Sequence, residues 1–499
     1  MSAQFILSLD IGTGSARAAL VDRRGTVVAI ASRPHEQIVP RFGWSEQRPL
    51  EWWDGAVAAI AEILSKAEGG AASIAAVVAC GQMHATVLLD ADGRPTLDAV
   101  PLWNDKRPTA EVAAWNRQHP QDYFARTANP ATAAWPAFKL QWLRQHMPAA
   151  YAAATTVLSP KDYINFRLTG VRATDWTEAS ASFLIDPETG TWSPGLVAEL
   201  GLRADLLPPI HQPADILGGI TPAAAAATGL RAGTPVLAGG ADFPTSLLGS
   251  GVFQPGLASD ITGTSSIVTV IGTAPIAHPE LTNVAIAGGY WGAFTLLDSG
   301  GDAVRWALRA FDGGGRDYAA AAATAAEAPA GANRLFFLPY LSGERLGAAP
   351  NSRAQFFGLT ASHGPADLHR AVLEGVAFAS RRQLDFMHQA GQRPERFMAG
   401  SGGARSDLWM RIKASMYDAP VLIPSEAESG VLGCAILGWL AVGQLASLAD
   451  GVARLVRYEQ EIPPDPAWRD RYDRMAPIFN RLYRTAQDFY DDLDALDGG

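Results

Sequence analysis

Early in the chain, short apolar runs are followed by a longer amphipathic segment and then by another apolar run. Residues 5–11 (FILSLDI), 16–22 (ARAALVD) and 27–32 (VVAIAS) are apolar runs of strand length. Residues 49–67 (PLEWWDGAVAAIAEILSKA) repeat apolar side chains at helical spacing, and residues 74–81 (IAAVVACG) return to a strand pattern. This order predicts an α/β fold.

The turn after the first strand recurs much later in the chain. Residues 8–20 (SLDIGTGSARAAL) place an acidic residue at the end of an apolar run, then a Gly/Thr/Ser turn, then an alternating run, and residues 256–272 (GLASDITGTSSIVTVIG) repeat this order. A helical pattern follows the second copy at residues 300–311. After Asp10 the chain continues as a strand and a hairpin turn at residues 22–26 (DRRGT), so the context of a dinucleotide-binding GxGxxG turn is missing. The repeat predicts two similar modules.

A chain of 499 residues is too long for one compact core, so we expect the two modules to be two domains. A stretch rich in Pro and Gly at residues 234–256 lies between them. We therefore place the boundary at residue 250, with an N-terminal domain of residues 1–250 and a C-terminal domain of residues 251–499.

The charge balance argues against nucleic acid as a partner. Forty basic and fifty acidic residues give a net charge of -10, and no run of Lys or Arg could follow a phosphate backbone. The uncharged residues 431–449 approach the length of a membrane span, but they contain three glycines and a glutamine and lack a basic flank. We expect a buried core helix there and no contact with a membrane.

The two cysteines and the first residues suggest the compartment. Cys80 and Cys434 lie in apolar or Gly-rich surroundings without metal-site spacing, which fits buried thiols in a reducing cytosol. The apolar run at the start lacks basic residues and is interrupted by Asp10, so we expect no signal peptide. The sequence therefore predicts a cytoplasmic protein.

Both Gly/Thr/Ser turns are suited to phosphate groups. Such a turn leaves backbone N–H groups free, and glycine lets an anion approach closely. One turn from each domain could hold the β- and γ-phosphates of a nucleotide from opposite sides. Either turn by itself could also be only a tight hairpin, but their shared pattern favours the phosphate interpretation.

Two carboxylates lie next to these glycine-rich turns. Asp10 at the first turn would be repelled by phosphates unless Mg²⁺ intervened, so it could bind the metal or a metal-bound water; alternatively, it caps its own turn. Asp242 follows an apolar strand and a glycine-lined turn, where it could accept a hydroxyl proton during phosphoryl transfer. Alternatively, Asp242 only binds nearby N–H groups.

Three further segments share a pattern of apolar strand, glycine and polar residues: 75–85, 235–244 and 396–406. Ligands of α/β sheets gather at such carboxyl ends of strands. With the two phosphate turns these segments predict a site in a cleft between the domains. The GSGGARS turn at residues 400–406 could support a flat adenine or its ribose.

Ten stretches over nearly the whole chain resemble, in family order, the FGGY carbohydrate kinases, and among them most of all the xylulokinase branch. They begin at Asp10 (DIGTGS), Gly43 (GWSEQRPLEWW), Gly81 (GQMHATVLLD), Leu102 (LWNDKR), Ser159 (SPKDYINFRLTG), Gly239 (GGAD), Leu338 (LPYLSGER), Phe356 (FFGLTASHGPADLHRAVLEGVAFA), Gly400 (GSGGARS) and Glu428 (ESGVLGCAILG). The resemblance implies two actin-like, ribonuclease-H-like domains around a central cleft that holds ATP, Mg²⁺ and an open-chain sugar.

The resemblance also implies roles for individual residues. Asp242 would be the general base, and Asp10 would lie near the metal and the transferred phosphoryl group. The residues that would hold the nucleotide belong to the two phosphate turns, the start of a helix and the adenosine turn: Gly12, Thr13, Gly14, Gly263, Thr264, Gly301, Gly402, Gly403 and Ala404. The first domain would thus contain the sugar site, the first phosphate turn and the base, and the second domain the second phosphate turn and the adenosine turn.

On the sugar side, the resemblance implies contacts from two motifs in the first domain. The residues are Gln82, Met83, His84, Trp103 and Asn104. His84 would offer hydrogen bonds to sugar hydroxyls, whereas Trp103 could equally be a core residue. Xylulokinases usually have Asn directly after the base, but here Phe243 follows Asp242, so an amide that would bind a sugar hydroxyl is lost.

The resemblance implies ATP-dependent phosphorylation of the terminal hydroxyl of a ketopentose. The reaction expected first is the conversion of D-xylulose to D-xylulose 5-phosphate. Because of Phe243, another pentulose or a polyol (ribulose, erythritol or a pentitol) stays an alternative substrate. A non-enzymatic, actin-like nucleotide-binding module is a further alternative, against which the sugar-side motifs argue. Kinases of this family are often dimers, so a homodimer is possible.

Overall fold

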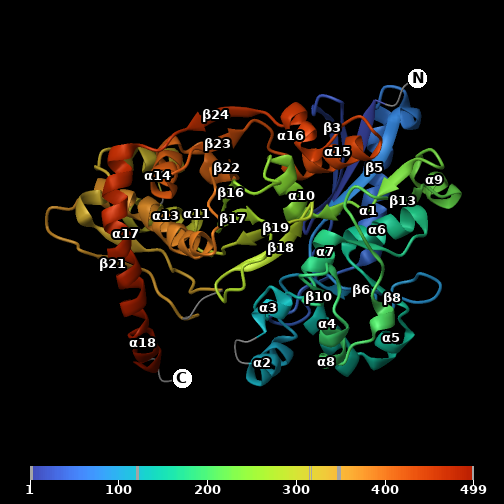
Figure 1. The fold of residues 1–499 in the computed structure, drawn as a ribbon, viewed down its shortest axis with the longest axis horizontal. Helices are drawn as coiled ribbons and strands as arrows, with labels where there is room; N and C mark the ends of the chain where they lie inside the picture. The colour runs from blue at the N-terminus through green and yellow to red at the C-terminus, as the bar shows by residue number, and fades with distance from the viewer. Residues whose placement is uncertain (1–3, 120–122, 314, 316, 346–349, 497–499) are drawn as a thin grey trace.

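The computed structural model describes residues 4–119, 123–313, 315, 317–345 and 350–496. Figure 1 shows two lobes, each built around one sheet. The first sheet has the order β13-β14-β5-β1-β2-β3, with β15 also paired to β5. Its strands are β1 (Phe5–Ile11), β2 (Ser15–Val21), β3 (Val27–Pro34), β5 (Ile74–Gly81), β13 (Ile216–Gly219), β14 (Pro235–Leu237) and β15 (Gly240–Ala241).

The second sheet has the order β18-β19-β17-β16-β22-β23-β24. Its strands are β16 (Leu257–Thr262), β17 (Ser266–Gly272), β18 (Thr282–Ile286), β19 (Tyr290–Phe294), β22 (Arg396–Gly400), β23 (Val421–Pro424) and β24 (Tyr458–Ile462). Short pairs complete the strands: β4 (Glu46–Gln47) with β7 (Val100–Pro101), β6 (Val87–Leu89) with β8 (Thr156–Leu158), β9 (Thr174–Asp175) with β12 (Ile210–His211), β10 (Ile185–Asp186) with β11 (Thr191–Trp192), and β20 (Phe336–Leu338) with β21 (Gln355–Phe357).

The two sheets repeat one local arrangement. β1 and β2 form an antiparallel hairpin, and β5 is parallel to β1. Likewise, β16 and β17 form an antiparallel hairpin, and β22 is parallel to β16. Parallel pairing brings the carboxyl ends of β1 and β5 to the same edge of the first sheet, and those of β16 and β22 to the same edge of the second. The repeated module expected from the two turns is therefore present.

Helices cover both sheets. In the first half they are α1 (Pro49–Lys66), α2 (Thr109–Gln118), α3 (Phe124–Thr127), α4 (Pro136–His146), α5 (Pro148–Ala153), α6 (Pro160–Thr169), α7 (Trp176–Ser180), α8 (Pro194–Glu199), α9 (Pro222–Thr228) and α10 (Asp242–Gly249). In the second half they are α11 (Gly301–Asp312), α12 (Tyr318–Ala326), α13 (Pro365–Gln389), α14 (Asp407–Tyr417), α15 (Ser429–Ala441), α16 (Leu448–Leu455), α17 (Pro466–Gln487) and α18 (Tyr490–Leu496).

Local sequence explains why α1 forms and packs. Pro49 occupies its first turn, where the missing N–H costs nothing. Trp52, Ala56, Ile60 and Ile63 recur at helical spacing and are buried against the first sheet. The helices expected at residues 49–67 and 300–311 are thus confirmed as α1 and α11.

Only the first part of the uncharged run that begins at Val431 forms the buried helix α15, which ends at Ala441, so the helix expected over residues 431–449 is shorter than the run. Although it comes late in the chain, it packs on β1 and β5 of the first sheet, in one apolar cluster with Cys80 and Cys434. The hydroxyl of Ser8 donates to the carbonyl of Val431 at 3.0 Å. Both cysteines are buried and free. Within the described part of the chain, none of the helices is both long and apolar enough to cross a membrane.

Candidate active site

Asp10 and Asp242 lie at the carboxyl ends of two strands that flank β5. Cys80 on β5 is paired with Asp10 on one side and with Gly240 on the other. Asp242 is the first residue of α10 rather than a turn residue, and its Oδ1 accepts a hydrogen bond from the N–H of Phe243 at 2.7 Å. The sheet thus brings together two carboxylates that are far apart in sequence.

The ionisation of Asp242 depends on this placement. Burial disfavours the charged carboxylate, and the negative charge of Asp10 adds to this effect. Together they raise the pKa of Asp242 from 3.8 to about 7. A carboxylate with a pKa near neutrality can both accept and release a proton under ordinary conditions, as a general base must.

Arg17 on β2 holds Asp10 and connects it to the second half of the chain. Its Nε donates to Asp10 Oδ2 at 3.2 Å, and Nη2 contacts the same oxygen. Its Nη1 donates to Glu428 Oε2 at 2.6 Å, just before α15 begins. Sequence reasoning did not single out Arg17 or Glu428, although Arg17 stands opposite Asp10 in the predicted hairpin.

Hydrogen bonds join the first Gly/Thr/Ser turn to the sugar-side motifs. The Thr13 hydroxyl donates to Gln82 Oε1 at 3.2 Å and accepts from the indole N–H of Trp103 at 3.1 Å. Buried Gln47 donates to the Thr13 carbonyl at 2.6 Å and accepts from Gln82 Nε2 at 2.8 Å. The turn closes with a bond from Gly12 N–H to the carbonyl of Ser15 at 3.0 Å. Gln47 lay in a recognised motif, but no pattern of spacing indicated this contact.

The sugar-side residues differ in their surroundings. Trp103 is 38% exposed, so it is not a core residue. Met83 packs against an apolar cluster of the first half. Asn104 Oδ1 is buried and accepts no hydrogen bond from the described residues, which leaves an acceptor available.

His84 is held tightly and stays uncharged. Its backbone has a φ of 69°, and one ring nitrogen, Nδ1, lies 3.0 Å from the carbonyl oxygen of Ala181. Lys139 Nζ donates to the carbonyl of His84 at 2.9 Å. Burial first, and then the positive charge of Lys139, lower the pKa of His84 to about 3. A neutral imidazole can exchange hydrogen bonds with hydroxyl groups.

Phe243 is directed into an apolar contact between the halves. Its ring meets Phe294 of β19 edge to face, with centroids 5.2 Å apart. Phe243 therefore has a packing role next to Asp242, which an amide at this position could not fill.

Several predicted nucleotide residues line one cavity in the second half. The cavity has a volume of about 920 Å³. The lining residues that were predicted to hold the nucleotide are Gly263, Thr264, Gly301, Gly402 and Gly403. The N–H of Gly301, at the start of α11, donates to the carbonyl of Gly263 at 2.8 Å. The N-terminus of a helix thus meets the second Gly/Thr/Ser turn, an arrangement that favours anions.

Other predicted residues lie outside this lining. Gly12, Thr13 and Gly14 form the turn between β1 and β2, and Ala404 packs against the core of the second half while its neighbours face the cavity. Sequence reasoning assigned no function to the alanine-rich segment that became α12. One side of α12 lines the cavity with Tyr318, Ala319, Ala322, Ala323 and Ala326. The helical spacing of these small residues was the available signal.

Comparison with known proteins gives one consistent family. Residues 5–249 match the profile of the FGGY family of carbohydrate kinases, N-terminal domain, and residues 258–442 that of the C-terminal domain. The chain is similar to the xylulose kinase of Escherichia coli (strain K12), with 32% identity over 96% of this chain and 98% of that protein.

Solved structures show the same similarity. The xylulose kinase from Rhodospirillum rubrum has a TM-score of 0.92 and 34% identity, covering 98% of this chain and 100% of that one. The gluconate kinase from Lactobacillus acidophilus has a TM-score of 0.91 and 26% identity, covering 98% and 99%. The expected α/β fold of two actin-like domains is confirmed.

Proposed function

The chain belongs to the FGGY family of carbohydrate kinases, and from this premise we propose that it transfers the γ-phosphoryl group of ATP to the terminal hydroxyl of D-xylulose. The family membership makes the chain an ATP-dependent sugar kinase, so the non-enzymatic binding module is no longer an alternative. The choice of D-xylulose rests on the similarity to xylulose kinases. The observation that carries the mechanism is the raised pKa of Asp242 beside Asp10.

In this mechanism, ionised Asp242 accepts the proton of the terminal sugar hydroxyl. The hydroxyl oxygen forms a bond to the γ-phosphorus, the bond from that phosphorus to the β,γ-bridging oxygen breaks, and ADP leaves. Gln82, His84 and Asn104 would orient the sugar through its hydroxyl groups. The neutral state of His84 supports this role, because a neutral imidazole can both donate and accept hydrogen bonds with hydroxyl groups.

The cavity of the second half would hold the nucleoside of ATP. Its volume and the small residues of α12 suit a flat base, and the turn with Gly263 and Thr264 would bind phosphate oxygens through backbone N–H groups. Gly12, Thr13 and Gly14 would contact the transferred phosphate from the first half. These assignments stay predictions.

Asp10 is the residue that would hold Mg²⁺. Protein sites for Mg²⁺ commonly supply one or two carboxylates while substrate phosphates and water supply the other ligands. Asp10 is a buried carboxylate near the first turn, and Arg17 donates to one of its two oxygens, Oδ2. This donor set fits the ion. When bound, Mg²⁺ would neutralise charge that develops on the phosphoryl oxygens.

Phe243 bears on the choice of sugar. Its ring offers no hydrogen bond where xylulokinases usually have an amide, and it packs on Phe294. A hydroxyl that loses its partner lowers specificity by a few kcal/mol. Ribulose, erythritol or a pentitol therefore stays the alternative substrate.

ADP release by the purified protein with Mg-ATP tests the proposal. We expect strong stimulation by D-xylulose and weaker stimulation by D-ribulose, erythritol and xylitol. Stimulation by one of these others alone would change the substrate but keep the mechanism. Lack of stimulation by every sugar would contradict the proposed reaction.

Assembly and location stay predictions from the sequence. The sugar substrate is the expected partner, and we propose a homodimer that does not bind nucleic acid and acts in the cytoplasm. Light scattering during gel filtration would distinguish a dimer from a monomer, whose mass is 52.8 kDa.

A further inference from the structure

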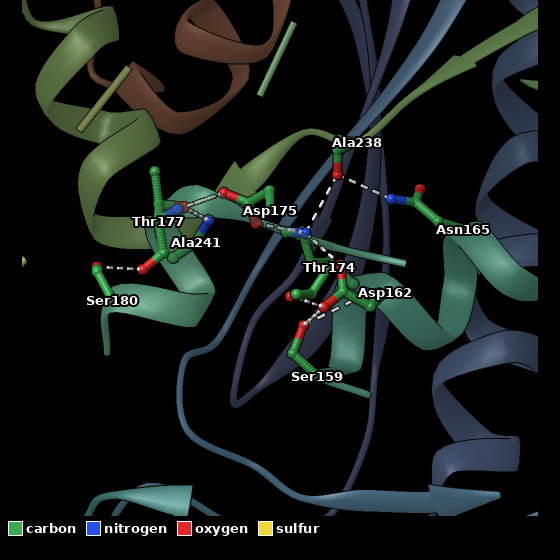
Figure 2. Close-up of polar contacts among 10 residues, drawn as sticks. Ser159, Asp162, Asn165, Thr174, Asp175, Thr177, Ser180, Ala238 and Ala241 are labelled. Carbon is green, nitrogen blue, oxygen red and sulfur yellow. Dashed lines mark hydrogen bonds and ion pairs between the residues drawn. The ribbon is translucent and has the colours of Figure 1, made fainter. Parts of the chain in front are cut away.

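A buried cluster of charges lies beside the segment from Ala238 to Ala241, which directly precedes Asp242 (Figure 2). Lys161 at the start of α6 lies with Nζ 2.7 Å from Asp175 Oδ2 and also contacts Asp162. All three side chains are almost fully buried. Burial alone would lower the pKa of Lys161, but the two carboxylates raise it, so the lysine is charged.

This cluster holds the start of the turn. Lys161 Nζ donates to the carbonyl oxygen of Ala238 at 3.1 Å, and Asn165 Nδ2 donates to the same oxygen at 2.9 Å. Gly239 follows with a φ of 68°, and a Cβ atom there would collide with the carbonyl oxygen of Ala79. The chain therefore has little freedom at this end of the turn.

Thr177 of α7 holds the other end. Its hydroxyl lies 2.5 Å from Asp175 Oδ1 and 2.8 Å from the N–H of Ala241, the residue before Asp242. Burial raises the pKa of Asp175, but the ion pair with Lys161 favours its charged form. An ionised carboxylate only accepts hydrogen bonds, so the single hydroxyl proton of Thr177 goes to Asp175. The Thr177 oxygen is then free to accept from Ala241. Asp175 thus fixes the hydrogen-bond direction of the Thr177 hydroxyl, which donates to Asp175 and accepts from Ala241. Lys161 balances the negative charge of Asp175.

Stability alone is a poor explanation for this arrangement. Buried ion pairs contribute little net stability, because desolvation offsets most of the attraction between the charges. What the cluster does provide is two fixed points, Ala238 and Ala241, on either side of two glycines, in addition to the pairing of β15 with β5. The next side chain is that of Asp242.

We propose that Thr177, oriented by Asp175, is a positioning residue that holds the Asp242 carboxylate in its reactive place. The inference rests on the proposed role of Asp242 as general base. Thr177 acts through the backbone of Ala241 and needs no contact with sugar or ATP. Its loss should therefore affect the chemical step and leave the binding of both substrates intact.

The test compares Thr177→Val with Thr177→Ser in steady-state kinetics with the sugar that stimulates ADP release. Valine keeps the shape but leaves the N–H of Ala241 without an acceptor. Because a small misplacement can cost up to about a hundredfold, we expect kcat to fall about tenfold or more. KM for ATP and for the sugar should each stay within about twofold, and serine should restore kcat.

Thr228→Val is the matched control. Thr228 is also a buried threonine whose hydroxyl donates to a carbonyl, that of Ala224 at 2.7 Å, and accepts from an N–H, that of Leu230 at 3.3 Å. It lies at the end of α9, away from Asp242. We expect this variant to lose thermal stability while kcat stays unchanged, which separates positioning from general destabilisation.

Asp242→Asn separates the failure of the inference from the failure of the proposed function. If Asp242→Asn is inactive and Thr177→Val keeps the kcat of the unaltered protein, the positioning role of Thr177 is wrong, and the proposed role of Asp242 as general base is retained. If Asp242→Asn itself keeps normal turnover, the proposed base is wrong. Should Thr177→Val not fold, Thr177→Ala carries the same prediction, with serine again as the restoring variant.

Discussion

Gln47 donates a hydrogen bond from Nε2 to the carbonyl oxygen of Thr13 at 2.6 Å. Its Oε1 accepts from the amide of Gln82 at 2.8 Å and from the indole of Trp52 at 3.0 Å. One buried side chain thus joins the first Gly/Thr/Ser turn to a sugar-side residue and to the helix α1. The proposed phosphate and sugar sites of the first half therefore share one supporting side chain.

Gln47→Leu should impair both sites. The change leaves three polar groups without partners, and for the two buried ones the cost is about 1–3 kcal/mol each in the free energy of unfolding. We expect KM to rise for ATP and for the sugar together, because the turn and Gln82 lose the same support. Gln47→Glu keeps the acceptor but not the donor, so it should raise KM mainly for ATP. Equal effects of both variants on both KM values would contradict this division.

The activity should depend on the ionisation of Asp242. Only the charged carboxylate can accept a proton, and the pKa of Asp242 is about 7. We therefore expect kcat/KM for the sugar to rise with pH up to about 7 and then to level off. Asp10→Asn removes a negative charge that raises this pKa. In the residual activity of that variant, the pH at which kcat/KM for the sugar begins to fall should shift to a lower value. An unchanged pH would argue against Asp242 as the titrating group.

Asp242→Asn should lower the activity and raise the stability of the protein. Removal of a general base costs about 10²- to 10⁴-fold in rate. Because burial raises the pKa of Asp242 from 3.8 to about 7 in the folded protein, stability falls as the pH rises between these two values and stays lower above them, and the amide avoids that cost. We expect thermal unfolding at pH 8 to occur about 2 °C higher or more, a difference that shrinks toward pH 5. A lower unfolding temperature at pH 8 would contradict the raised pKa.

His84 should make the protein sensitive to acid. Its pKa is about 3 when folded and near 6.5 in an unfolded chain, so the unfolded state binds the proton more readily. Stability should therefore fall as the pH drops from 6.5 toward 4. His84→Gln lacks this group, and urea unfolding at pH 7 and pH 5 should show a smaller loss for the variant than for the unaltered protein.

The cavity beside α12 should respond to a larger side chain. Ala322→Leu places extra carbon atoms in the proposed nucleoside site, so we expect KM for ATP to rise about tenfold while KM for the sugar changes little. Ala226→Leu, at an exposed position of α9, is the control and should change neither constant. An unchanged KM for ATP in Ala322→Leu would remove α12 from the nucleotide site.

Local pattern alone determined the elements and the repeated turn. The strands before and after DIGTGS, the helix α1 and the buried helix α15 depend on periodicity and on the absence of charge, which act over a few neighbouring residues. Glycine-rich turns at strand ends are also local, so both turns could be identified in the sequence as candidates for phosphate binding. The sequence did not show that one of these turns lines a cavity in the second half, whereas the other belongs to a hydrogen-bonded network in the first half.

Only the tertiary structure decided the electrostatics of the site. The pKa of Asp242 depends on Asp10, which parallel pairing with β5 brings near from the other end of the first half. Arg17 meets Glu428 across 411 positions of sequence. Thr177 reaches Ala241 across 64 positions. Charge interactions and hydrogen bonds act through space, whereas periodicity acts along the chain, so no local pattern could predict which partners would meet.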